Sequence, residues 1–154
     1  MKMKDKIGRM LVATDGSTKA TEALKLALYL ANSLGAEVEI FHVIPSAAPT
    51  LGASIRLGGA APGRLHDYDV EQKANSEKLI QEATDESKKG YPQLTITSKI
   101  LEGDPASTIL EESENDFDVI VLGHHGHSHL NELILGSVSE KVIHKSKITV
   151  ILST

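Results

Sequence analysis

The fold is decided by residues 7–17, which read IGRMLVATDGS. An apolar run up to Thr14 is followed at once by Asp15-Gly16, a dipeptide typical of turns. The pattern predicts a buried strand that ends at this turn. Behind the turn, apolar residues recur at helical spacing, and Gly35 follows where a helix-ending glycine belongs. The helical set comprises Ala20, Ala23, Leu24, Ala27, Leu28, Ala31 and Leu34.

The same alternation of strand and helix patterns continues to the end of the chain. Further strands are predicted at 38–44, 94–100, 119–122 and 148–152, and further helices at 66–89, 105–114 and 137–145. The order β-α-β-α-β-α-β-α-β predicts a parallel sheet with helices on both faces, a single Rossmann-like α/β domain. Residues 45–63 are rich in Ala, Gly and Pro and are interpreted as a long mobile loop, either a functional lid or simply disordered.

The compositions of the strands suggest their positions in the sheet. Strands one, two and four are continuous apolar runs, whereas three and five alternate apolar with polar residues. Edge strands tolerate alternation, so the order 3-2-1-4-5 places the alternating pair at the edges. The chain then reverses direction between strands one and four, where ligands bind in open α/β sheets. The loops there begin at Asp15-Gly16 and at Gly123.

Composition narrows the class of protein. A length of 154 residues suits one domain, residues 1–154. Sixteen basic and 21 acidic side chains give a net charge of −5, which argues against binding to nucleic acid or to an anionic membrane. The absence of cysteine excludes disulfides, thiolate zinc sites and thiol catalysis. No window approaches the roughly 20 apolar residues of a membrane span, and the start lacks the apolar core of a signal peptide, so we expect a cytoplasmic protein.

A glycine-serine motif follows the fourth strand. Gly123-His124-His125-Gly126 is followed after nine residues by Gly136-Ser137-Val138-Ser139. Glycines at a strand exit let backbone N–H groups approach a ligand, and a helix N-terminus with a hydroxyl favours phosphate. Either half alone also fits a plain glycine turn and an ordinary Ser N-cap. The motif is neither a Walker A loop, because no Lys precedes Ser137, nor the dinucleotide fingerprint.

The pattern Gly-x2-Gly-x9-Gly-Ser, with Val-Ser-Glu-Lys-Val-Ile behind it, resembles the ATP-binding branch of the universal stress protein family. The opening Val12-Ala13-Thr14-Asp15-Gly16-Ser17 and the strand end His42-Val43 match this family too. The resemblance implies the adenine-nucleotide α-hydrolase-like fold. It also implies bound ATP, or AMP or ADP, with Mg²⁺ or Mn²⁺, and homodimers paired through the C-terminal strand.

The resemblance also implies roles for individual residues. Asp15 matches the family acid near the ribose and the metal, and Ala13 and Val43 match positions that line the adenine pocket. The ribose and phosphate contacts match Gly123, Gly126, His127, Ser128, His129, Gly136, Ser137, Val138 and Ser139. Two departures are Ala13, where Pro is common, and the pair His124 and His125, where small polar and basic residues are common.

Some of these residues have alternative readings. Asp15 before Gly-Ser favours a turn and can cap the following helix, and it equally suits an oxygen-seeking Mg²⁺ beside a phosphate site. The histidines at 124, 125, 127 and 129 could bind Zn²⁺ or Ni²⁺, but no ligand spacing supports such a site, and we expect solvated or phosphate-facing side chains. His42 and His66 are interpreted as structural or surface residues.

No constellation of catalytic residues stands out, so the sequence predicts at most slow ATP hydrolysis. The leading hypothesis is a dimeric, adenine-nucleotide-binding stress-response module that signals to an unknown protein partner. The alternatives are a dimeric scaffold of the same family that binds no nucleotide, and a slow ATPase.

Overall fold

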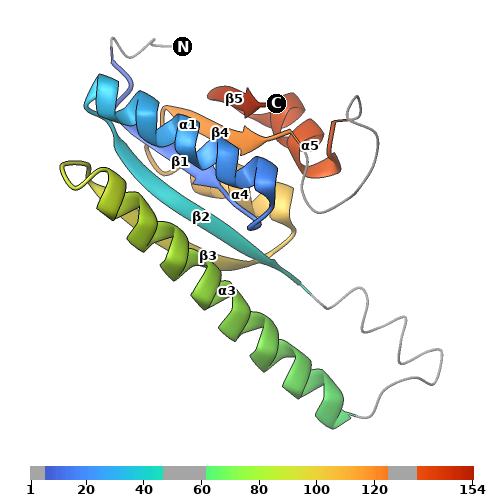
Figure 1. Ribbon diagram of the computed structural model, residues 1–154. Helices are drawn as coiled ribbons and strands as arrows, with labels where there is room; N and C mark the ends of the chain where they lie inside the picture. The colour runs from blue at the N-terminus through green and yellow to red at the C-terminus, as the bar shows by residue number, and fades with distance from the viewer. Residues whose placement is uncertain (1–5, 47–61, 125–134) are drawn as a thin grey trace.

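Five parallel strands form one sheet in the order β3-β2-β1-β4-β5 (Figure 1). The structure is a computed structural model that describes residues 6–46, 62–124 and 135–154. The strands are β1 (Arg9–Ala13), β2 (Glu37–Pro45), β3 (Ile96–Gly103), β4 (Val119–Gly123) and β5 (Thr149–Ser153). The helices are α1 (Thr18–Leu34), α3 (Pro62–Gly90), α4 (Pro105–Ser113) and α5 (Ser137–Lys145). The predicted α/β class and strand order are confirmed.

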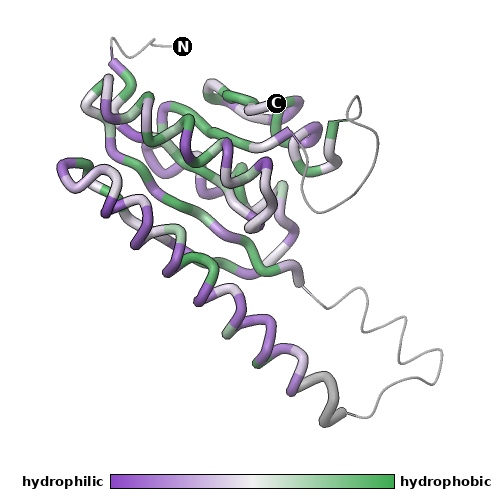
Figure 2. Tube along the Cα trace, in the orientation of Figure 1, coloured by the Kyte–Doolittle hydropathy of each residue, from purple (hydrophilic) through white to green (hydrophobic). Residues whose placement is uncertain are grey.

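In the described part of the chain, two helices cover each face of the sheet, and alternate residues of each strand supply the two cores. On one face, α1 and α3 pack on residues such as Val12, Ile40 and Val121. On the other, α4 and α5 pack on Leu11, Phe41 and Ile120, among others. Burying one such side chain stabilises the fold by roughly 1.5–3 kcal/mol, so the central strands need apolar residues on both faces. Figure 2 shows hydrophobic residues concentrated along the strands and a mainly hydrophilic α3.

Helix ends are set by local capping. Ser17 is the N-cap of α1 and accepts a hydrogen bond from the Ala20 N–H, while Gly35, at φ 65°, ends the helix in the left-handed region. Asp104 caps α4 in the same way. The N-cap of α5 is Gly136, which makes no side-chain capping bond. As far as the described residues are concerned, the first turn of α5 therefore keeps N–H donors that a ligand can use.

Two predicted boundaries were wrong. The segment predicted as the loop 45–63 begins and ends inside regular structure, because β2 includes Pro45 and α3 starts at Pro62; residues 47–61 lie outside the described part of the chain. The third strand is Ile96–Gly103 and not 94–100, because its pairing with β2 continues as far as Pro45 opposite Gly103. In Figure 1, α3 runs alongside β2 and continues past the end of that strand.

Candidate functional site

A cavity of about 560 Å³ lies where β1 and β4 end, at the predicted switch point of the sheet. This volume falls within the roughly 300–1,000 Å³ of small-molecule sites. Every predicted site residue that the structure describes lines the cavity, namely Ala13, Asp15, Val43, Gly123, Gly136, Ser137, Val138 and Ser139. Gly126, His127, Ser128 and His129 lie outside the described residues.

The turn after β1 is tight and is held by its own side chains. The Ser17 N–H donates to Asp15 Oδ1 at 3.0 Å, and the Gly16 N–H donates to Thr14 Oγ1 at 3.2 Å. Gly16 has φ 78°, and a Cβ there would lie 2.5 Å from Leu79 Cδ1. Asp15 thus shapes the turn while lining the cavity, and the N-cap of α1 is Ser17. Both readings of Asp15, turn former and ligand-facing acid, are compatible with this position.

The exit of β4 is tied to the start of α5. The Ser139 hydroxyl donates to the Gly123 carbonyl at 2.9 Å, and the Gly136 N–H donates to the His124 carbonyl at 3.1 Å. Ser137 is exposed and is the first helical residue, so it is not the N-cap that the alternative reading of the motif required. These bonds hold the first turn of α5 at the wall of the cavity, where Ser137 and Val138 contribute to the lining.

His42 is a site residue that sequence reasoning missed. It is buried and lines the cavity. Its Nδ1 lies 2.8 Å from the Thr14 carbonyl oxygen and its Nε2 lies 3.0 Å from Ser76 Oγ. A carbonyl can only accept, so Nδ1 carries the proton and Nε2 accepts from the Ser76 hydroxyl. His42 therefore links β2 both to the residue before Asp15 and to α3.

Helix α3 supplies a second set of missed residues, Gln72, Asn75, Ser76 and Leu79, all of which line the cavity. Their spacing of three, four and seven residues places them on one face of the helix. The spacing is visible in the sequence. The sequence of the helix alone does not indicate that this face meets the ends of β1 and β2.

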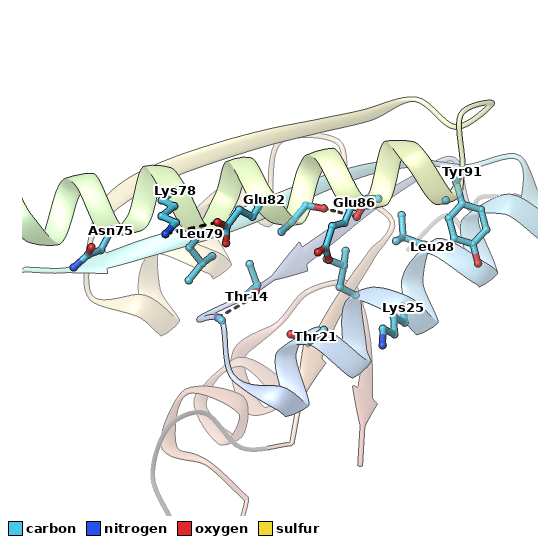
Figure 3. A pocket seen from close by; sticks show the side chains of 15 residues that line it. Thr14, Thr21, Lys25, Leu28, Asn75, Lys78, Leu79, Glu82, Glu86 and Tyr91 are labelled. Carbon is cyan, nitrogen blue, oxygen red and sulfur yellow. Dashed lines mark hydrogen bonds and ion pairs between the residues drawn. The ribbon is translucent and has the colours of Figure 1, made fainter.

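A second cavity of about 620 Å³ lies between α1 and α3 (Figure 3). Figure 3 shows Leu79 and Glu86 directed from α3 toward α1. Thr14, Asn75 and Leu79 line both cavities. The two cavities therefore adjoin at these residues.

The described residues contain neither a candidate metal cluster nor a helix suited to span a membrane. Within residues 6–46, 62–124 and 135–154, no group of three His, Cys, Asp or Glu side chains is placed to hold a metal ion. Among the helices described, none has the length and apolar character needed to cross a membrane.

Comparisons with known proteins agree with the geometry. The model of the universal stress protein family matches residues 6–153. Universal stress protein YxiE of Bacillus subtilis (strain 168) is 35% identical over 136 residues, which cover 87% of this chain and 90% of the relative. Stress response protein NhaX of the same organism is 32% identical, covering 94% of this chain and 96% of the relative.

Three solved structures share the fold. Universal stress protein UspA from Lactobacillus plantarum has a TM-score of 0.81 at 19% identity, covering 98% of this chain and all of that one. A universal stress protein in complex with cAMP has a TM-score of 0.64 at 23% identity, covering 96% and 97%. One from Archaeoglobus fulgidus in complex with dAMP has a TM-score of 0.66 at 20% identity, covering 96% and 98%. With a family match along nearly its whole length and a cavity at the switch point of the family's sheet, this chain belongs to the universal stress protein family.

Proposed function

We propose that the cavity binds an adenine nucleotide and that the protein acts as a nucleotide-responsive stress-response module. The observation that carries the proposal is the first turn of α5, which has no side-chain cap and lines the same cavity as Ala13 and Val43. Free N–H donors and the positive end of the helix dipole favour phosphate, and apolar walls favour a base. The cAMP and dAMP complexes of two similar proteins support this choice of ligand.

The two ends of the cavity differ in character, which suggests how the nucleotide lies. Because β2 and β4 flank β1 on opposite sides, the residues of β2 and α3 lie at one end and those of β4 and α5 at the other. Phosphates would bind at the α5 end, against the N–H groups of its first turn and the exposed hydroxyl of Ser137. The base would then occupy the end formed by Ala13, Val43 and α3.

A divalent cation would accompany the phosphates. Asp15 is the carboxylate that lines the cavity, and no three-residue metal cluster occurs in the described parts of the chain. This donor set fits Mg²⁺ or Mn²⁺, since such ions commonly use one or two carboxylates with water and substrate phosphates. The cation would neutralise phosphate charge next to Asp15.

Dimerisation through β5 is part of the same proposal. The two edge strands differ, because β3 contains Lys99 and Glu102 whereas β5, with the sequence TVILS, has no charged residue. Charged side chains protect an edge from pairing, and an uncharged edge can pair with a second copy. A two-fold dimer would join β5 of one protomer to β5 of its partner.

The proposal is tested at the first turn of α5 with a pair of variants of equal size. Ser137→Asp adds a negative charge where phosphate would bind, and Ser137→Asn adds none. We expect Asp to weaken ATP binding at least about tenfold more than Asn, measured by calorimetry on protein freed of bound ligand. Ser137 is exposed, so either substitution should leave the fold intact, and an acidic residue in the first turn also favours the helix.

A second variant and a chemical assay separate the alternatives. Gly126→Val, at a position outside the described residues, should abolish binding without unfolding, because the family resemblance assigns a phosphate contact to this glycine and a larger side chain would obstruct it. Small molecules released on denaturing purified protein should include an adenine nucleotide. No heat with AMP, ADP or ATP would reject the proposal and favour the scaffold, whereas turnover lost in Gly126→Val would favour the slow ATPase.

A further inference from the structure

The face of α3 changes character where the helix leaves the sheet. Toward its C-terminal half, Ile80, Thr84 and Ser87 are buried. Toward its N-terminal half, the same face carries Gln72 and Asn75, which line the cavity at the end of β2. These two amides belong to the end of the cavity that α3 forms with β2.

Neutral amides suit a base and not a phosphate. An amide offers one acceptor oxygen and one donor group, which match the edge of a purine, whereas phosphate favours cationic side chains or helix N-termini. The described residues that line the cavity contain neither Lys nor Arg, and its phosphate-favouring group lies at the α5 end. The amides of α3 therefore stand at the end of the cavity where the base belongs.

The orientation of Gln72 is held by its own helix. Its Nε2 donates to the Tyr68 hydroxyl, one turn earlier, at 3.0 Å. The amide nitrogen carries two N–H groups, so this bond uses one of them and fixes which way the amide is turned, and Oε1 remains as an acceptor for a ligand in the cavity. Adenine carries an amino donor at position 6, whereas hypoxanthine and guanine carry a carbonyl acceptor there.

The helix itself is anchored next to these residues. Ser76, one turn after Gln72, is buried and donates to His42 Nε2 at 3.0 Å, and Leu79 lies against Gly16. The anchor fixes how far α3 stands from the ends of β1 and β2. Gln72 is thus presented to the cavity by a rigid element, as precise recognition requires.

We infer that Gln72 is the residue that selects adenine over 6-oxopurines, with Tyr68 as the positioning residue that orients its amide. The inference rests on the proposed nucleotide function and adds the basis of its selectivity. An acceptor opposite the 6-amino group forms a hydrogen bond, whereas the same acceptor opposite a 6-carbonyl leaves two acceptors facing each other without a proton.

The test compares AMP with IMP, which differ at position 6 and at the adjacent N1, an acceptor in AMP and an N–H donor in IMP. We expect the wild-type protein to bind AMP about tenfold or more tightly than IMP, a modest value for one hydrogen bond gained and one repulsion avoided. Gln72→Leu should bring the ratio of the two dissociation constants close to one. Gln72→Glu keeps an acceptor and should retain the preference for AMP.

Tyr68→Phe distinguishes orientation from mere contact. It leaves Gln72 in place but frees the amide to turn, so the AMP to IMP preference should fall while AMP affinity changes little. The matched control is Gln81→Leu, because Gln81 is an exposed glutamine of α3 that likewise donates to a residue one turn away, Asp85, and lines neither cavity.

The outcomes separate the two proposals. A wild-type protein that binds no adenine nucleotide overturns the proposed function and the selectivity with it. A protein that binds AMP and IMP equally, or one whose preference survives Gln72→Leu, overturns the role of Gln72 and leaves the nucleotide function intact. A preference lost in Gln72→Leu and kept in Gln81→Leu supports the assignment.

Discussion

Gly123 lies against the backbone of Lys19: a Cβ built on Gly123 would stand 2.8 Å from both the carbonyl carbon and the carbonyl oxygen of Lys19. The glycine at the exit of β4 is therefore required for packing against the first turn of α1, in addition to any contact with a ligand. Backbone atoms cannot rotate away as a side chain can, so a methyl group there must displace either β4 or α1.

Gly123→Ala should destabilise the protein by about 1–3 kcal/mol, the typical cost of overpacking. The free energy of unfolding from urea titrations measures the effect. Gly90→Ala is the control, because a Cβ at Gly90 has no neighbouring atom within 4 Å. Equal stability of Gly123→Ala and the wild-type protein would contradict the close approach.

His42→Leu should destabilise the fold and weaken nucleotide binding together. The change leaves the Thr14 carbonyl and the Ser76 hydroxyl without the imidazole, and each lost buried bond costs about 1–3 kcal/mol. His42→Asn is the informative partner, because its amide can still donate near the position of Nδ1. We expect His42→Asn to recover nucleotide binding, measured by calorimetry, more than stability, measured by urea titration. Identical losses of binding and stability in both variants would show that the Thr14 bond does not position the turn.

Glu39 makes the stability depend on pH. Burial raises the pKa of Glu39 above 4.5, and the nearby Glu112 carboxylate raises it further, while Lys99 and Arg9 oppose the shift. Among the described residues, Glu39 Oε1 is buried without a hydrogen-bond partner, and both Glu112 oxygens accept from Lys99 at 2.9 and 2.8 Å. Because the pKa is raised in the folded state, Glu39 contributes to the free energy of unfolding through its protonated form. That contribution is fully present below about pH 4.5 and is lost as the pH rises through the folded pKa.

Glu39→Gln should therefore raise the urea midpoint near neutral pH, and its advantage over the wild-type protein should shrink as the pH falls toward about 4.5. Urea titrations at several pH values measure both midpoints. Glu37→Gln, at a more exposed carboxylate of the same strand, is the matched control. A gain that is constant across the pH range would assign the effect to packing and not to ionisation.

Val150→Pro should weaken the proposed dimer roughly tenfold or more without unfolding the protomer. The Ser153 carbonyl accepts from the His124 N–H, so the backbone groups of Ser153 point toward β4. Backbone groups of successive strand residues alternate in direction. Three residues earlier, the N–H of Val150 therefore points away from β4. Proline is tolerated at such an edge position. Light scattering measures the association. Ile151→Pro is the comparison, because it should damage the pairing of β5 with β4. A wild-type protein that is monomeric at tens of micromolar would contradict the dimer.

Much of the fold could be predicted because its signals are local. The apolar run before Asp15-Gly16 and the helical spacing behind it specify one strand–turn–helix unit, and repetition of that unit implies a parallel sheet. The predicted boundaries failed at Pro45 and at β3, where pairing between strands, and not the composition of either strand, decides how far the ladder extends.

The sequence by itself determined the class of fold and the strand order, because glycine spacing and hydrophobic periodicity are properties of short segments. The residues from Ala13 to Ser139 that the structure places at the cavity were predicted from the resemblance of their motifs to the universal stress protein family. Only the tertiary structure decided that His42 and Gln72 belong to the same site, and that Gly123 faces Lys19. Those relationships depend on where α3 and α1 dock on the sheet. Docking is set by packing between segments that are distant in the chain, and no single segment carries that information.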